Sequence, residues 1–209
     1  MSLVTNWGYN LTGEITTLPD MLTTEDFNTY TANKYSGDTR IASEIKTASM
    51  AIRNYCGWHV YPSENCSMQE RILYGNGRLK RIGKDLLIQL PAKFVTAVSS
   101  VTIDGKTYTD FDFEGDGLVH VFDIPALTRK SVVTVAYTAG VSAAFMDALK
   151  ELVAHRVTHA LASSNGVTSE AAGGVSVTYN ANWINSARAS ALPDDNKEVL
   201  APYKLQGVF

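Results

Sequence analysis

One segment, residues 132–164, constrains the fold more than any other, because a strand-like run leads directly into a long helical one. The residues from Val132 to Tyr137 are β-branched or aromatic with apolar residues on both faces, which is typical of a strand buried on both sides. Gly140 should end this strand. From Ser142 the apolar residues recur at three- and four-residue steps, which predicts a helix over 142–163 of about six turns. The expected core residues of this helix are Phe145, Leu149, Leu152, Val153 and Val157.

A second amphipathic helix is predicted over 38–56. Asp38 is placed to cap its start, and Gly57 follows where helices commonly end. The two long helices should bury their apolar faces against each other, the second contributing Ile41, Ile45 and Ile52. The charged side chains expected to point outward from it are Arg40, Glu44, Lys46 and Arg53. A shorter helix is predicted over 24–31.

The stretch between the two long helices, residues 66–138, is strand-like. The dipeptide Asp104-Gly105 and the tripeptide Gly75-Asn-Gly77 favour tight hairpin turns. Residues 107–113 are expected to form one strand that pairs with the strand before it. A succession of such hairpins predicts an antiparallel meander that ends in the strand at 132–137.

The two outer segments differ in character. Residues 1–20 are polar, with Trp7, Tyr9 and Leu11 as isolated apolar side chains, and suit either a floppy terminus or an arm that docks on a partner. Residues 164–209 should contain a mobile loop rich in Ser, Ala and Gly, a short strand, and a C-terminal helix and tail.

Together these elements predict an α+β fold. We expect a helical core of two long packed helices plus short helices, with an inserted antiparallel β-meander and extended terminal arms. The predicted organisation has three parts: an N-terminal arm (1–20), a core (21–163) with helices 24–31, 38–56 and 142–163 and the β-rich insertion 66–138, and a C-terminal region (164–209).

Composition narrows the classes of protein. The apolar fraction of 45% permits a sizeable core, and a net charge of −3 gives no global attraction to nucleic acid or to an anionic membrane. Residues 1–6 lack the features of a signal peptide, so we expect a protein that is cytosolic where it is made, with no membrane contact. In that compartment Cys56 and Cys66 are expected to be reduced thiols.

The strongest candidate for chemistry is a polar stripe on the helix at 142–163. Glu151, His155 and His159 follow one another at four-residue steps, and two imidazoles at this spacing can share a metal ion. The catalytic zinc motif H-E-x-x-H would require a glutamate after His155, where this chain has Arg156. We therefore interpret the stripe as a helix or subunit contact and expect no metal, no cofactor and no catalytic residue.

Two further patterns resemble ligand-binding loops. The sequence from Asp110 begins like a calcium loop but has Val121 where a bidentate glutamate is needed, and its alternation favours a half-buried strand. A basic segment follows Gly77, and it lacks the G-K-[ST] of a phosphate loop. Its cations could contact DNA or a neighbouring subunit, or they could form a solvated charge run. They are Arg78, Lys80, Arg81 and Lys84.

The order of five short stretches is more informative than any one of them. They are Ile52-Arg-Asn-Tyr-Cys-Gly-Trp58, Leu90-Pro-Ala-Lys-Phe-Val-Thr-Ala-Val-Ser-Ser-Val101, Val133-Thr-Val-Ala-Tyr-Thr-Ala-Gly140, Ala148-Leu-Lys-Glu-Leu-Val-Ala-His-Arg156 and Glu198-Val-Leu-Ala-Pro-Tyr-Lys204. In this order, over residues 22–205, the chain resembles the head-to-tail connector proteins of long-tailed bacteriophages, also called adaptor or head-completion proteins. No single stretch is diagnostic of the family.

The resemblance implies a structural protein and not an enzyme. It implies a homo-oligomeric ring beneath the portal protein, in the virion neck, that extends the channel for packaged DNA without sequence specificity and offers a docking surface to a downstream tail or neck protein. Such a subunit would be made in the host cytoplasm. By likeness, the segment expected to reach the portal contains Leu200, Pro202, Tyr203, Leu205 and Phe209.

Two other functions stay open at this point. A tail-completion or other tube-forming virion protein would also oligomerise but would bind the tail. A metal-dependent hydrolase would use Glu151, His155 and His159.

Overall fold

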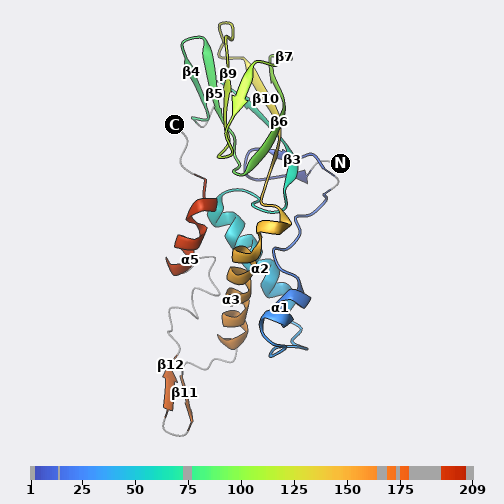
Figure 1. The fold of residues 1–209 in the computed structure, drawn as a ribbon, viewed down its shortest axis with the longest axis vertical. Helices are drawn as coiled ribbons and strands as arrows, with labels where there is room; N and C mark the ends of the chain where they lie inside the picture. Colours follow the sequence, from blue (N-terminus) through green and yellow to red (C-terminus); the bar gives the residue numbers. More distant parts are fainter. Residues whose placement is uncertain are drawn as a thin grey trace. The chain divides into compact units, whose positions relative to one another are not determined.

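The structure is a computed structural model that describes residues 3–13, 15–72, 77–163, 169–172, 175–178 and 194–205. The chain divides into two compact units (Figure 1). Unit 1 comprises Met1–Pro19, Gly57–Ala143 and Tyr203–Phe209, and unit 2 comprises Asp20–Cys56 and Ala144–Pro202. Each unit is therefore assembled from segments that are far apart in the sequence.

The larger sheet of unit 1 has six strands in the order β1-β2-β3-β10-β6-β7, and every neighbouring pair is antiparallel. The strands are β1 (Leu3–Val4), β2 (Asn10–Leu11), β3 (Glu64–Arg71), β6 (Val95–Ile103), β7 (Lys106–Tyr108) and β10 (Val132–Ala139). In β10 only alternate residues are fully buried, among them Val133 and Val135, so this strand turns one face to the core and not both as predicted. Gly140 ends it at φ +130°, where a Cβ would overlap the Pro62 carbonyl.

The smaller sheet of unit 1 has four antiparallel strands in the order β4-β5-β9-β8. They are β4 (Leu79–Ile82), β5 (Asp85–Gln89), β8 (Phe111–Phe113) and β9 (Leu118–Val121). Its two inner strands bury alternate side chains: Leu86, Ile88, Val119 and Val121. Because alternate residues of a strand point to opposite faces, one face of this sheet belongs to the core and the other is more exposed.

The helices belong to unit 2. They are α1 (Thr24–Tyr30), α2 (Ile41–Cys56), α3 (Asp147–Ser163) and α5 (Asp194–Leu200), accompanied by a hairpin of β11 (Ser169–Ala172) and β12 (Val175–Thr178). The helices α1, α2 and α3 contact one another. Lys150 of α3 lies 3.0 Å from Asp26 of α1. The short 3₁₀ turns are Ala143–Phe145 before α3 and Ala201–Tyr203 after α5.

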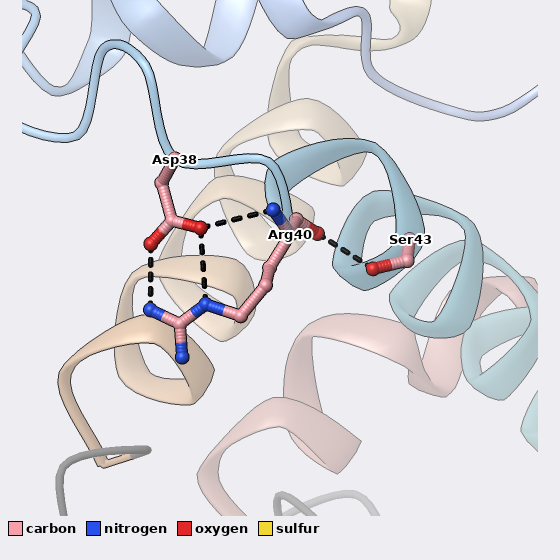
Figure 2. Close-up of polar contacts among 3 residues, drawn as sticks. All are labelled: Asp38, Arg40 and Ser43. Carbon is pink, nitrogen blue, oxygen red and sulfur yellow. Dashed lines mark hydrogen bonds and ion pairs between the residues drawn. The ribbon is translucent and has the colours of Figure 1, made fainter.

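The Asp38 side chain binds the residue just ahead of α2 (Figure 2). Its Oδ1 accepts a hydrogen bond from the backbone N–H of Arg40 at 2.9 Å. The guanidinium of Arg40 also donates to both carboxylate oxygens, from Nε at 3.0 Å and from Nη2 at 2.6 Å. Ser43 Oγ donates to the Arg40 carbonyl at 2.8 Å. Asp38 was predicted to cap a helix that starts directly after it, whereas the helix begins at Ile41 and Asp38 binds Arg40, the residue just ahead of it.

The predicted fold class is wrong. The described part of the chain is mostly antiparallel β-sheet with four short α-helices, and the strands are not an insertion into a helical core of two long packed helices. In unit 1 they form two sheets with buried side chains of their own, and the N-terminal segment contributes two strands. The strands do not form a meander either, because β10 lies between β3 and β6.

Seven of the eight predicted core residues are buried: Ile41, Ile45, Ile52, Leu149, Leu152, Val153 and Val157. The eighth, Phe145, is 75% exposed. It lies in the 3₁₀ turn ahead of α3, so the helical spacing that placed it on the core face does not reach it. Arg53, expected to point outward, is only 1% exposed in unit 2. Among the described residues, no helix is both long and apolar enough to cross a membrane.

Candidate functional site

The C-terminal segment of unit 1 is held by an aromatic group formed by Trp58, Phe94 and Tyr203. Trp58 is buried, and its Nε1–H donates to the Tyr203 carbonyl at 2.6 Å. The ring of Phe94 stacks on Trp58 with centroids 6.2 Å apart and lies 5.5 Å from the Tyr203 ring. Leu205 is next to Gly57, where an added Cβ would lie 3.7 Å from its Cδ1. This group fixes where residues 203–205 lie on unit 1.

The residues predicted to contact a portal are in different environments. Leu200 is fully buried at the end of α5, whereas Pro202 is exposed. Tyr203 and Leu205 are half-buried, and Phe209 lies outside the described residues. A partner could therefore reach Pro202 directly, while Leu200 would first have to leave its buried position.

Sequence reasoning missed Trp58 and Phe94 as contributors to this segment. Trp58 directly follows the glycine that ends α2, and a large aromatic residue at that position was the signal that the sequence offered. Phe94 gave no comparable signal, because its side chain is 40% exposed and its φ of +52° cannot be inferred from the sequence.

The predicted basic residues gather at one edge of the four-stranded sheet. Lys80 and Arg81 lie in the outer strand β4, with Arg78 just before it and Lys84 in the turn after it. Arg81 Nε donates to the Gly83 carbonyl at 2.9 Å, and Lys84 lies 3.4 Å from Asp123. Lys80, Arg81 and Lys84 are exposed, and Arg78 is half-buried. The structure thus places all four cations along one strand and its flanks.

The opposite edge of this sheet is acidic. Around the outer strand β8, Asp110, Asp112 and Glu114 alternate with Phe111 and Phe113. The three acidic residues are exposed and the two phenylalanines are half-buried, which confirms the interpretation of this segment as a half-buried strand. One carboxylate oxygen of Asp112 accepts the backbone N–H of Phe113 at 2.8 Å. The acidic residues line a sheet edge and do not surround a common centre.

The histidine stripe on α3 brings two rings together. The centroids of His155 and His159 are 4.8 Å apart. Burial, followed by the neighbouring His155, lowers the pKa of His159 below its ordinary value of 6.5. Across the part of the chain that the structure describes, no three His, Cys, Asp or Glu side chains are grouped so that they could hold a metal ion. The hydrolase alternative gains no support from this geometry.

The N-terminal segment is anchored by a buried histidine of unit 1. Tyr9 Oη lies 2.6 Å from His59 Nδ1 and accepts the His59 backbone N–H at 3.0 Å. His59 Nε2 lies 3.0 Å from the Pro62 carbonyl and 3.1 Å from that of Ala139, two acceptors that require an N–H at this atom. Since Tyr9 and Leu11 are buried, this part of the predicted arm belongs to the body of unit 1.

The pattern of the head completion protein family matches residues 20–205. No curated protein sequence matches the chain. Among solved structures, the fold is similar to that of a chain in the "Neck of empty GTA particle computed with C6 symmetry", with a TM-score of 0.51 and 16% identity, over 94% of this chain and 96% of that one. At this identity the similarity demonstrates a shared fold.

Proposed function

Because the chain belongs to the head completion protein family, we propose that it is a structural subunit of the head-to-tail junction of a phage-like particle. The observation that carries this proposal is the extent of the family match, which runs from residue 20 to residue 205 and so includes both units. The similarity of its fold to a chain from the neck of a GTA particle is consistent with the same place in a particle.

In this role, copies of the chain form a ring beneath the portal protein and extend the channel through which packaged DNA passes. The ring offers its far side to a downstream tail or neck protein. A net charge of −3 suits a channel wall along which DNA must slide, because few fixed cations are available for the counterion release that favours DNA binding. The subunit acts by binding, without a catalytic step or a cofactor.

Within the predicted portal segment, Pro202 and Phe209 are our candidates for direct contact. Pro202 is exposed in the free chain, and Phe209 lies four residues beyond Leu205. Tyr203 is engaged through its carbonyl by Trp58, and Leu200 is buried, so both residues instead hold the segment in place. This division of roles separates residues that bind the portal from residues that position the binding segment.

The test uses particles from a strain that lacks the gene for this chain. We expect heads that fill with DNA but lose it and do not join tails, and purified wild-type protein added to these heads should restore both DNA retention and tail joining. Heads that mature normally without this chain would refute the proposed role.

Two variants test the portal segment in a binding assay with the isolated portal protein. Deletion of residues 206–209 keeps the Trp58–Tyr203 hydrogen bond and should reduce binding to the isolated portal, as should Pro202→Glu. Ser142→Glu, at an exposed position of unit 1, is the matched control and should bind normally. Undiminished portal binding by both variants would rule out the assignment of this segment.

A further inference from the structure

We propose that the two outer strands of the four-stranded sheet form the contact between neighbouring copies of this chain, with the basic β4 edge of one copy binding the acidic β8 edge of the next. This inference rests on the proposed function, in which copies assemble side by side. It identifies the two surfaces that meet and the side chains that determine how neighbouring copies bind.

Both strands have an edge that is available for pairing. In the described part of the chain, β4 pairs with β5 alone and β8 pairs with β9 alone. The outer side of such a strand presents backbone N–H and C=O groups that can pair with a strand of another chain. Ile82, at the end of β4, is 52% exposed and adds an apolar side chain to this edge. Among the described residues, no strand covers either side of this sheet.

The register of the sheet aligns the opposite charges in one row. Lys80 is opposite Leu87, Leu87 is opposite His120, and His120 is opposite Asp112. Directly opposed residues project from the same face of a sheet, so Lys80 and Asp112 stand at the two ends of one row on the more exposed face. If a second copy continues the sheet in this register, its Asp112 lies beside Lys80 of the first.

The neighbouring row of opposed residues also has a cation at the β4 edge and an anion at the β8 edge. The Arg78 carbonyl accepts the N–H of Gln89, Gln89 is opposite Leu118, and the Leu118 carbonyl accepts the N–H of Glu114. Arg78 and Glu114 therefore end this second row as Lys80 and Asp112 end the first. The β4 edge of one copy is therefore complementary in charge to the β8 edge of another copy. Two β4 edges, or two β8 edges, would instead bring like charges together.

Strand direction also favours this contact. Three successive antiparallel pairings, β4 with β5, β5 with β9 and β9 with β8, make β4 and β8 antiparallel to each other. A second copy in the same orientation therefore offers its β8 antiparallel to β4 of the first. The contact is heterologous, because two different surfaces meet, and repeating it by a constant rotation closes a ring.

DNA is the other candidate for the basic edge, and a second copy is favoured because the chain itself carries the matching acidic edge in the same two rows. A DNA contact would need only the cations. It would give no role to Asp112 and Glu114, which lie in the same rows as these cations. The two candidates predict different results for substitutions at the acidic edge.

The first experiment reverses one charge at each edge. Lys80 and Asp112 are exposed, so Lys80→Glu and Asp112→Lys should fold normally, as circular dichroism can check. Each variant alone should bind to its neighbours about tenfold more weakly, measured as copies incorporated into heads that lack the chain. An equimolar mixture of the two variants should recover incorporation, because each mutated edge then meets an edge of opposite charge. The double variant should also recover it.

The outcomes separate the two levels of the proposal. If wild-type protein does not bind the heads, the proposed function fails. If wild-type protein binds and both variants match it, the proposed function stands and the edge contact is wrong. If Lys80→Glu weakens incorporation but Asp112→Lys does not, and the mixture gives no recovery, the basic edge contacts DNA or another partner and the edge contact is again wrong.

A zero-length carbodiimide crosslink gives an independent measurement on assembled wild-type necks. Within one copy, Lys80 and Asp112 are three strand spacings apart, about 14 Å, too far for a direct amide bond. A Lys80–Asp112 crosslink therefore reports two copies, and isotope-mixed samples should show it between light and heavy chains. Lys84 and Asp123, 3.4 Å apart in one copy, are the positive control. Necks that yield the control crosslink but no Lys80–Asp112 crosslink would overturn the proposal.

Discussion

Asp38, three residues before the start of α2, has a carboxylate whose pKa is set by Arg40. Hydrogen bonds from the Arg40 side chain, followed by the one from its backbone, lower the pKa of Asp38 from 3.8 to about 2. Because the folded-state pKa lies below the unfolded value, the stabilisation from this carboxylate is fully present above pH 3.8 and is lost as the pH falls through about 2.

We predict that the Asp38 carboxyl titrates with a midpoint of about 2 by NMR. Arg40→Gln should move the midpoint upward, toward 3.8, because it removes the guanidinium that contacts both carboxylate oxygens. Ser43→Ala is the control, since Ser43 binds the Arg40 carbonyl and not the carboxylate. An unchanged midpoint in Arg40→Gln would show that the guanidinium is not the cause.

At the scale of single residues, the sequence predicted types of environment better than individual contacts. The position of Asp38 near a helix start follows from the preference of aspartate for such positions, but its pairing with Arg40 depends on a side-chain conformation that no spacing rule gives. Arg53 was assigned to the surface because it is charged. Its long aliphatic stem can pack in a helical unit, and it is in fact buried.

At the scale of elements, α3 allows a direct comparison of two residues from one predicted stripe. Leu149 is fully buried within α3, and Phe145 lies exposed in the turn before it. Leu149→Ala should lower the free energy of unfolding by about 2–5 kcal/mol through lost burial and the cavity that remains. Phe145→Ala should change it by no more than about 0.5 kcal/mol.

Urea unfolding of both variants checks this pair, with equal slopes required for a valid comparison. A large decrease in the free energy of unfolding of Phe145→Ala would support the original prediction that Phe145 belongs to the buried face of the helix. Since the side chain is 75% exposed, Phe145→Ala is also a suitable probe of partner binding.

Local signals located most of the regular elements, but not the partners of the strands. The Asp104-Gly105 turn joins β6 to β7 as expected, because a tight turn fixes the pairing of the strands next to it. The predicted strand at 107–113 is split: β7 pairs in the six-stranded sheet and β8 in the four-stranded one. No local residue pattern states that a strand changes sheets.

At the scale of the whole molecule, the predicted fold class was wrong because strand pairing between distant segments leaves no local pattern in the sequence. β10 pairs with β3, 61 to 75 residues earlier, and with β6, so the sheet depends on contacts between distant segments. Helical periodicity, in contrast, is visible within a short stretch of residues. The prediction therefore gave the helices more weight than the sheets. The family resemblance was confirmed, because it rested on the order of segments along the whole chain and not on a correct fold.

Association of copies should depend on salt if the charged edges meet. Raising the salt concentration from about 0.1 M to about 1 M shortens the screening length from about 10 Å to about 3 Å. We predict that wild-type incorporation into heads falls over this range, and that the Lys80→Gln/Asp112→Asn variant, which lacks one charge pair, shows a smaller fall. Equal salt dependence for the two proteins would exclude a contribution from this pair.

The hydrogen bond from Trp58 to the Tyr203 carbonyl also sets a limit on reach. Phe209 is the fourth residue after Leu205, and four fully extended residues span about 14 Å at most. Phe209 can therefore lie no more than about 14 Å from Leu205, and a portal that binds through Phe209, as we propose, must come within that distance. Inserting a short flexible spacer after Leu205 would lengthen this reach and should weaken the restriction on where the portal is bound.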